Sequence, residues 1–330
     1  MIDRRQLLAG LAGLTGTSAA LLAAPWARAQ DAYPNQPVRW IVPYPPGGGT
    51  DVIARSLSEA MRAGLGQQFV VDNRPGAATN IGAELVMRAK PDGYTLMSAD
   101  NALLAFNEYL FGQLPFSPAR DFSYIGAIGK FPLALVVNPG FEPKDFKAFL
   151  AYVKAHPGEV NYASPGNGSP HHLAMEMFKN HTGTQLTHIP YRGAAPAMAD
   201  VMGGQVPCMF LDLASGLSVM QSGKVRVLAI GSAQRSKLLP DVPTLAEEGV
   251  RNTEVFAFQG IVGPAGLPEP VVRRLNSELN RSFSNPEVAR RFNDFGMEAM
   301  PGSPEQFFAL ARAESARWGP IIKAAGIKLD

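Results

Sequence analysis

The residues of this 330-residue chain that could do chemistry gather in glycine-rich turns. The stretch Tyr44-Pro-Pro-Gly-Gly-Gly-Thr-Asp51 follows an apolar strand pattern and opens an amphipathic helix pattern. A helix start leaves N–H groups unpaired at the positive end of its dipole, and glycine lets a ligand approach the backbone. Thr50 fits the N-cap position and Asp51 suits the first turn. The stretch predicts either an anion cradle or a tight turn whose glycines only satisfy backbone geometry.

A second turn of the same kind favours the cradle. Ser164-Pro-Gly-Asn-Gly-Ser169 also follows a strand pattern and precedes a helix pattern. Two further turns, Ala78–Asn80 and Ser98–Asn101, follow strand patterns in the first part of the chain. Because ligands collect at the carboxyl ends of strands in open α/β sheets, these turns predict a cleft that holds an acidic ligand from two sides.

Three single side chains near these turns each allow two interpretations. His172 either orients the second glycine-rich turn or hydrogen-bonds in the core. Arg192 follows a strand pattern and either reaches the cleft or stays on the surface. Asp212 either accepts a hydrogen bond from a ligand amine or hydroxyl, or caps the following helix, and capping is favoured.

The motifs of common enzymes and metal sites are missing from the sequence. Neither glycine-rich turn ends in the Lys-Ser/Thr of a P-loop, and no G-x-G-x-x-G or G-x-S-x-G motif occurs where it would be needed. The adjacent His171 and His172 point in different directions on a helix and poorly suit a shared metal. We therefore expect that the protein uses neither a metal nor another cofactor. We also expect that it is a binding protein. An exported enzyme acting on an organic acid and a ligand sensor for a signalling partner remain open.

The order of elements predicts an α/β fold with two lobes. Strand and helix patterns alternate between residues 38 and 99 and restart after residue 140, which predicts mostly parallel sheets flanked by helices. Two apolar runs, 131–138 and 225–232, could carry the chain between lobes and form a hinge. The predicted boundaries are 31–130 with 233–330 for lobe one, and 131–232 for lobe two.

The first 29 residues are typical of a twin-arginine signal peptide. Arg4 and Arg5 precede a mildly apolar run, and Ala27-Arg-Ala29 ends it, which predicts cleavage near Ala29 and a periplasmic protein. A membrane anchor is disfavoured because Gly, Ser and Thr dilute the run. Cleavage removes three arginines and one aspartate, which changes the formal net charge from +2 to zero. A neutral chain has no broad basic field for nucleic acid, and the single cysteine, Cys208, excludes an internal disulfide.

At these residues the sequence resembles the Bug-type (TctC-like) periplasmic receptors of tripartite tricarboxylate transporters. The resemblance covers nearly the whole chain after the leader. The stretches that carry it are Tyr33–Val38, Tyr44–Asp51, Asn80–Ala83, Pro91–Leu96, Asn161–Ser169 with His172-Leu173, His188–Gly193, Gly204–Val206 and Asp241–Leu245.

The resemblance implies a two-lobed Venus flytrap fold of the type II kind and a small organic carboxylate as ligand. It also implies delivery of that ligand to membrane permease subunits, and we expect a monomer. In such receptors backbone N–H groups and ordered waters hold the carboxylate. Matching the motifs residue by residue carries this role to Gly47, Gly48, Thr50 and Asp51 in lobe one, and to Ser164, Gly166, Gly168 and Ser169 in lobe two.

The sequence departs from the family pattern at two points. Ala78-Thr79 stands where a Gly-Gly pair is frequent, which predicts a differently shaped wall, and Pro165 stiffens the second turn. Selectivity beyond the carboxylate should depend on side chains such as Tyr44, Phe106, Tyr191 and Asp212.

Overall fold

The computed structural model describes residues 33–329, so the predicted signal peptide lies outside the described part of the chain. Within the described residues the strands form one ten-stranded sheet with the path β2-β1-β3-β9-β4-β7-β5-β6, and β8 and β10 pair with β4 off that path. None of the described helices is both long and apolar enough to cross a membrane.

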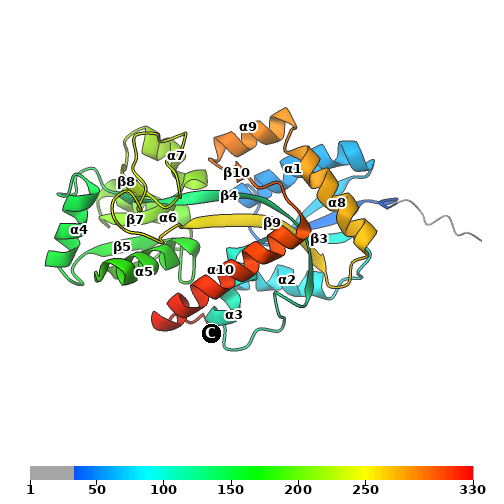
Figure 1. Cartoon of the computed structure of the whole chain (residues 1–330), viewed down its shortest axis with the longest axis horizontal. Helices are drawn as coiled ribbons and strands as arrows, with labels where there is room; N and C mark the ends of the chain where they lie inside the picture. The colour runs from blue at the N-terminus through cyan, green and yellow to red at the C-terminus, as the bar shows by residue number, and fades with distance from the viewer. Residues whose placement is uncertain (1–32, 330) are drawn as a thin grey trace, which may run out of the picture. The chain divides into compact units, whose positions relative to one another are not determined.

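The first part of the sheet is built by the βαβαβ start that the sequence predicts (Figure 1). Strands β1, β2 and β3 are parallel to one another. The elements are β1 (Val38–Val42), α1 (Gly49–Leu65), β2 (Phe69–Asn73), the 3₁₀ turn η1 (Ala77–Thr79), α2 (Asn80–Met87), β3 (Thr95–Asp100), the π-helix η2 (Ala102–Phe106) and α3 (Asn107–Leu110).

The second part repeats the pattern after strand β4 (Phe122–Val137). Strand β5 lies parallel to both β6 and β7. The elements are α4 (Phe146–Ala155), β5 (Asn161–Ser164), α5 (Pro170–Thr182), β6 (Thr187–Pro190), α6 (Ala194–Gly203), β7 (Cys208–Asp212), α7 (Leu213–Gln221) and β8 (Arg226–Ile230).

The last elements return to the first part of the sheet. Strand β9 (Phe256–Pro264) enters antiparallel between β3 and β4, a pairing that the strand patterns do not reveal. It is followed by α8 (Glu269–Ser282), α9 (Pro286–Asp294), β10 (Glu298–Ala299) and α10 (Pro304–Ala324). Helix α10 begins with a complete capping box between Ser303 and Gln306, and Pro304 occupies its first turn, where a missing N–H does no harm.

Strand β4 joins the two parts of the sheet. Residues 122–132 pair with β9, whereas residues 133–137 pair with β7 and β8. The apolar run 131–138 that was predicted to cross between lobes is therefore the second half of a longer strand. In Figure 1, β4 and β9 run side by side.

The predicted return crossing at 225–232 conflicts with the packing. That run forms β8, which pairs with the end of β4. Beyond it, Leu245, Val250 and Val255 lie in the same buried cluster as β4, β5 and β7, although the prediction places them in lobe one. The predicted boundary relied on hydrophobicity alone, which does not reveal strand partners. We propose instead that β9 carries the chain back, and that β4 and β9 form the hinge.

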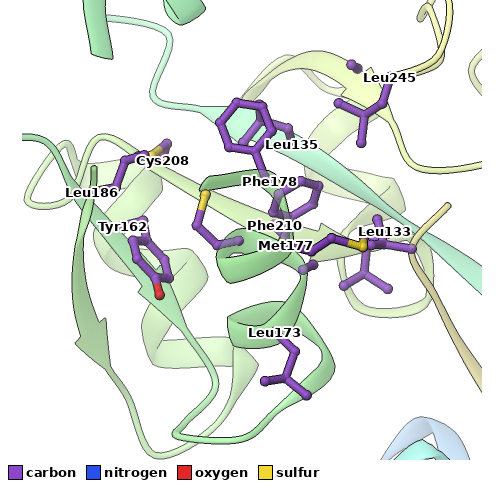
Figure 2. Packing of buried hydrophobic residues seen from close by; sticks show 14 of the residues in the cluster. Leu133, Leu135, Tyr162, Leu173, Met177, Phe178, Leu186, Cys208, Phe210 and Leu245 are labelled. Carbon is purple, nitrogen blue, oxygen red and sulfur yellow. The ribbon is translucent and has the colours of Figure 1, made fainter. Parts of the chain in front are cut away.

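Clusters of buried apolar side chains hold the described elements together. In the second lobe, Phe178 of α5 packs edge-on against Phe210 of β7 with ring centroids 6.3 Å apart (Figure 2). Burying one such side chain stabilises the fold by about 1.5–3 kcal/mol. Cys208 is fully buried there, and its thiol is free of any disulfide. These cores fix the strand ends from which the glycine-rich turns project.

Candidate functional site

The first glycine-rich turn is an open backbone surface in front of α1. Gly47 and Gly48 are exposed, and Gly47 has a φ of +84°, which favours glycine. Gly48, and not Thr50 as predicted, is the N-cap, and no side chain caps this helix. A Cβ built on Gly48 would meet only the Pro45 carbonyl oxygen, at 3.7 Å. The first N–H groups of this 17-residue helix therefore have no side-chain cap and follow an exposed glycine turn.

Asp51 holds this turn from behind. The side chain is 3% exposed and accepts hydrogen bonds from the Gly47 N–H at 2.9 Å, Asn73 Nδ2 at 3.0 Å and Arg55 Nε at 3.0 Å. Burial raises the pKa of Asp51, but the bonds from Arg55, Gly47 and Asn73 outweigh burial and hold the pKa below its usual range. Asp51 shapes the cradle, and its carboxylate is occupied within the protein.

Tyr44 is fixed in a similar way. Its hydroxyl donates a hydrogen bond to the Asp100 carboxylate, and its backbone carbonyl accepts one from Asn73. Burial, with the neighbouring Asp100 charge, raises the pKa of Tyr44 well above its usual value, so the hydroxyl keeps its proton. Burial also raises the pKa of Asp100, which accepts from the N–H of Ala102 as well.

The predicted site residues at the end of β3 make hydrogen bonds inside the protein. Ser98 is 2% exposed and its Oγ accepts a hydrogen bond from Trp40 Nε1 at 2.9 Å. Asn101 Oδ1 accepts from the Phe258 N–H at 2.7 Å and so ties β3 to β9. These two side chains hold the end of β3 in place and have their polar atoms occupied within the protein.

The turn before α2 is strained. Ala77, Ala78 and Thr79 all have positive φ, at 47°, 47° and 81°. Non-glycine residues in this region cost about 1–2 kcal/mol each. The hydroxyl of Thr79 is buried without a hydrogen-bond partner among the described residues. The Ala78-Thr79 pair, predicted to reshape this wall, thus adopts a backbone conformation that glycine would adopt at lower cost.

Gln259 of β9 contacts the first glycine-rich turn, and the sequence interpretation missed it. Its side-chain Nε2 donates to Thr50 Oγ1 at 3.0 Å, so it reaches the first turn of α1. The residue is 5% exposed. A lone polar residue inside the apolar run 256–262 was the signal that could have identified it.

The second glycine-rich turn is tied together from within. Ser164 is fully buried, and its Oγ lies 2.6 Å from His188 Nε2 and accepts from the Gly166 N–H at 3.1 Å. Gly166 has a φ of +145°, and an added Cβ would lie 3.4 Å from the Tyr191 carbonyl oxygen. His188 was missed by the sequence interpretation because it lies within a strand rather than in a turn.

His172 orients this turn, which is one of its two predicted roles. Its Nδ1 accepts a hydrogen bond from the Gly168 N–H at 3.1 Å, and its ring stacks on His188 at 3.8 Å. Burial, together with His188, lowers the pKa of His172 to about 3. Burial likewise lowers the pKa of His188 to about 4. Both rings are neutral at ordinary pH and act as packing and hydrogen-bonding groups.

Gly168 and Ser169 complete the turn. Gly168 is buried with a φ of +71°, and an added Cβ would meet Leu110 at 2.8 Å. Ser169 is the N-cap of α5, and its Oγ accepts from the His172 N–H at 3.3 Å. This cap contributes about 1 kcal/mol to the stability of the helix.

Three further predicted residues lie at the carboxyl ends of β6 and β7. The Tyr191 hydroxyl donates to Asp200 Oδ2 at 2.6 Å. Arg192 is exposed and makes no ion pair within residues 33–329. Asp212 caps α7, as favoured above, through the Ser215 N–H at 2.7 Å, and it also contacts His171 Nε2 at 2.8 Å.

The two turns therefore share one design. Their side chains are largely consumed in fixing the backbone, and what remains free in the first turn is a set of N–H groups at a positive helix end. Such a surface suits an anion with oxygen acceptors. No group of three metal-binding side chains occurs in the part of the chain that the structure describes.

Comparison with known proteins places this arrangement in a family. The sequence profile of the TctC family, described as the tripartite tricarboxylate transporter family receptor, matches residues 53–327. The structure of Rpa4515 from R. palustris with adipate is 32% identical and has a TM-score of 0.81, covering 90% of this chain and 100% of that one.

Two other solved structures are similar over the same length. The periplasmic binding protein BugD is 34% identical with a TM-score of 0.78, covering 90% of this chain and 100% of its own. MatC from Rhodopseudomonas palustris with bound malate is 30% identical with a TM-score of 0.78, covering 88% and 100%.

These matches confirm the resemblance and the two-lobed α/β fold of periplasmic binding proteins. The family and its structural neighbours are solute receptors, so the expectation of a non-enzymatic protein is confirmed as well. The chain belongs to the tripartite tricarboxylate transporter receptor family and is a solute-binding receptor rather than an enzyme.

Proposed function

We propose that this receptor captures a small organic carboxylate between its two glycine-rich turns and delivers it to the membrane permease subunits of a tripartite tricarboxylate-type transporter. The observation that carries the proposal is the uncapped start of α1. Gly48 and Gly49 leave the helix end open, and no side chain occupies it. A carboxylate there would accept N–H hydrogen bonds at the positive end of the helix dipole.

The fixed surroundings of the cradle support this role. Asp51 and Asn73 hold the first turn, and His172 holds the second. A preformed site loses little entropy when it binds, which favours affinity. The Thr50 hydroxyl accepts from Gln259, so its own proton is available to a bound carboxylate oxygen.

The second lobe would contribute the other side of the clamp. Arg192 is exposed at the end of β6, directly before the start of α6, which has no side-chain cap. A guanidinium at such a helix end suits a second acidic group or a polar tail of the ligand. We propose that it contacts the ligand when the lobes close about β4 and β9.

The solved neighbours support a carboxylate ligand. Rpa4515 is described with adipate and MatC with bound malate, and both molecules are dicarboxylates. For this chain we propose only what the two ligands have in common, which is a carboxylate group. Periplasmic location and a permease partner are proposed from family membership and from the leader expected at residues 1–29.

A thermal-shift screen with ligand recovery tests the proposal. Mono-, di- and aromatic carboxylates are added to the purified protein, and the corresponding neutral amides serve as matched controls. A cognate acid at a hundredfold excess over its Kd should raise Tm by about 5 °C, whereas its amide should not. Chromatography should recover the acid unchanged. Equal shifts by acid and amide would contradict the cradle, and consumption of the acid would contradict a receptor.

A further inference from the structure

Gln259 has a side-chain oxygen that no group in the described protein satisfies. The residue lies in the middle of β9, is 5% exposed, and its Oε1 is buried without a hydrogen-bond partner. A buried acceptor without a partner destabilises the folded protein, because it has lost its hydrogen bonds to water. Such an atom is explained if its partner arrives with the ligand. The inference that follows rests on the proposed function.

The other end of the same amide locates this oxygen. Gln259 Nε2 donates to Thr50 Oγ1 at 3.0 Å, and Thr50 lies in the first turn of α1. The two ends of an amide are adjacent, so Oε1 lies beside the proposed carboxylate cradle. The site thus has N–H donors at the helix start and one acceptor next to them.

The neighbours of Gln259 add no donor for it. In the antiparallel pairing of β3 and β9, Gln259 lies directly opposite Asp100, so both side chains project on the same face. Asp100 is itself an acceptor, and it takes hydrogen bonds from the Tyr44 hydroxyl and from the N–H groups of Ala102 and Leu103. On this face of the strand pair Asp100 therefore adds an acceptor, and no donor, opposite Gln259.

We propose that Gln259 is a specificity-determining residue that accepts a hydrogen bond from a donor on the carbon next to the bound carboxylate. The ligands that match are 2-hydroxy and 2-amino carboxylates. Their carboxylate would lie on the N–H groups of Gly48 and Gly49, and their hydroxyl or ammonium group would face Gln259 Oε1. An acid without a substituent at this carbon would leave the oxygen unsatisfied.

Calorimetry with matched acids tests this assignment. Three series keep the skeleton and vary one group: propionate, lactate and alanine; succinate, malate and aspartate; phenylacetate, mandelate and phenylglycine. In any series that binds, the hydroxy or amino acid should bind at least about tenfold more tightly than the unsubstituted acid. Comparison of the hydroxy acid with the amino acid in each series shows whether the site prefers a hydroxyl or an ammonium donor.

Two variants make the test specific to the residue. Gln259→Met keeps the length of the side chain and removes the amide, so the preference should fall below threefold. The preference is the ratio of the two affinities within one variant, so a general loss of affinity through Thr50 cancels from it. Gln221→Met, at an exposed position of α7, is the matched control and should keep the full preference. Without ligand, the free energy of unfolding of Gln259→Met should be at least as large as that of the wild type. This measurement shows whether the variant folds.

The outcomes separate the two proposals. Equal binding of substituted and unsubstituted acids by the wild type would overturn the role of Gln259 and leave the carboxylate receptor intact. An unchanged preference in Gln259→Met would also overturn it. Failure of every acid in all three series would contradict the proposed function itself, and this inference with it.

Discussion

His172 shows at the residue scale how a titratable side chain can hold a binding turn while remaining neutral. Its Nδ1 accepts the Gly168 N–H, so the proton of the ring lies on Nε2. The sequence allowed two roles for this histidine and could not decide between them. The decision depends on His188, which packs on the ring from another strand.

The lowered pKa of His172 predicts a pH dependence of stability. The folded-state pKa is about 3, below the unfolded value of about 6.5. As pH falls below 6.5, the His172 imidazole binds a proton in the unfolded chain but not in the folded chain. The folded state therefore loses stability as pH falls. Between pH 6.5 and 5 this residue should reduce the free energy of unfolding by about 2 kcal/mol.

The variant His172→Asn isolates this effect. Its amide oxygen can still accept the Gly168 N–H, but it does not titrate. Urea denaturation at pH 6.5 and 5 should show a loss smaller by about 2 kcal/mol in the variant than in the wild type. Parallel losses in the two proteins would show that His172 is not the group responsible.

At the scale of elements, the sequence predicted most of the strands and helices that follow from local hydrophobic patterns. The alternating strands and helices up to β3 and from β5 to β8 follow their hydrophobic periods. It could not predict that β4 continues from Phe122 to Val137 or that β9 enters between β3 and β4. Those features depend on partners more than 100 residues away in sequence. For the same reason the sequence did not reveal the bridging contacts of Asn101 and Gln259.

The strained turn before α2 gives a prediction about stability. Ala78 is exposed and has a φ of 47°, so replacing it by glycine removes the backbone strain. The glycine also loosens the unfolded chain, which offsets part of the gain. Ala78→Gly should raise the free energy of unfolding by roughly 0.5–1 kcal/mol.

The same substitution at an ordinary helical site is the control. Ala151 is exposed within α4, and Ala151→Gly should lower stability by about 1 kcal/mol. Both are measured by urea denaturation without ligand. A loss of similar size in both variants would show that the turn before α2 carries no relievable strain.

At the scale of the whole molecule, the two glycine-rich turns belong to different parts of the sheet that β4 and β9 connect. The sequence located both turns and the exposed glycines of the first one. It did not reveal that Asp51, Ser98 and Asn101 would be occupied by interior hydrogen bonds. The role of a side chain depends on groups that are far away in sequence but close in space. The position of an exposed glycine at a helix start depends on the local sequence.

The most direct test of the carboxylate cradle is a calorimetric titration of Gly48→Val with the acid that the screen identifies. Gly48 has a φ of −77°, and an added Cβ meets no atom closer than 3.7 Å, so the variant should fold. Its side chain would cover the N–H groups at the start of α1. Gly203→Val, at the far end of α6, is the matched control because an added Cβ there meets nothing within 4 Å. We predict at least about hundredfold weaker binding by Gly48→Val and unchanged binding by Gly203→Val. Wild-type affinity in a folded Gly48→Val protein would contradict the account.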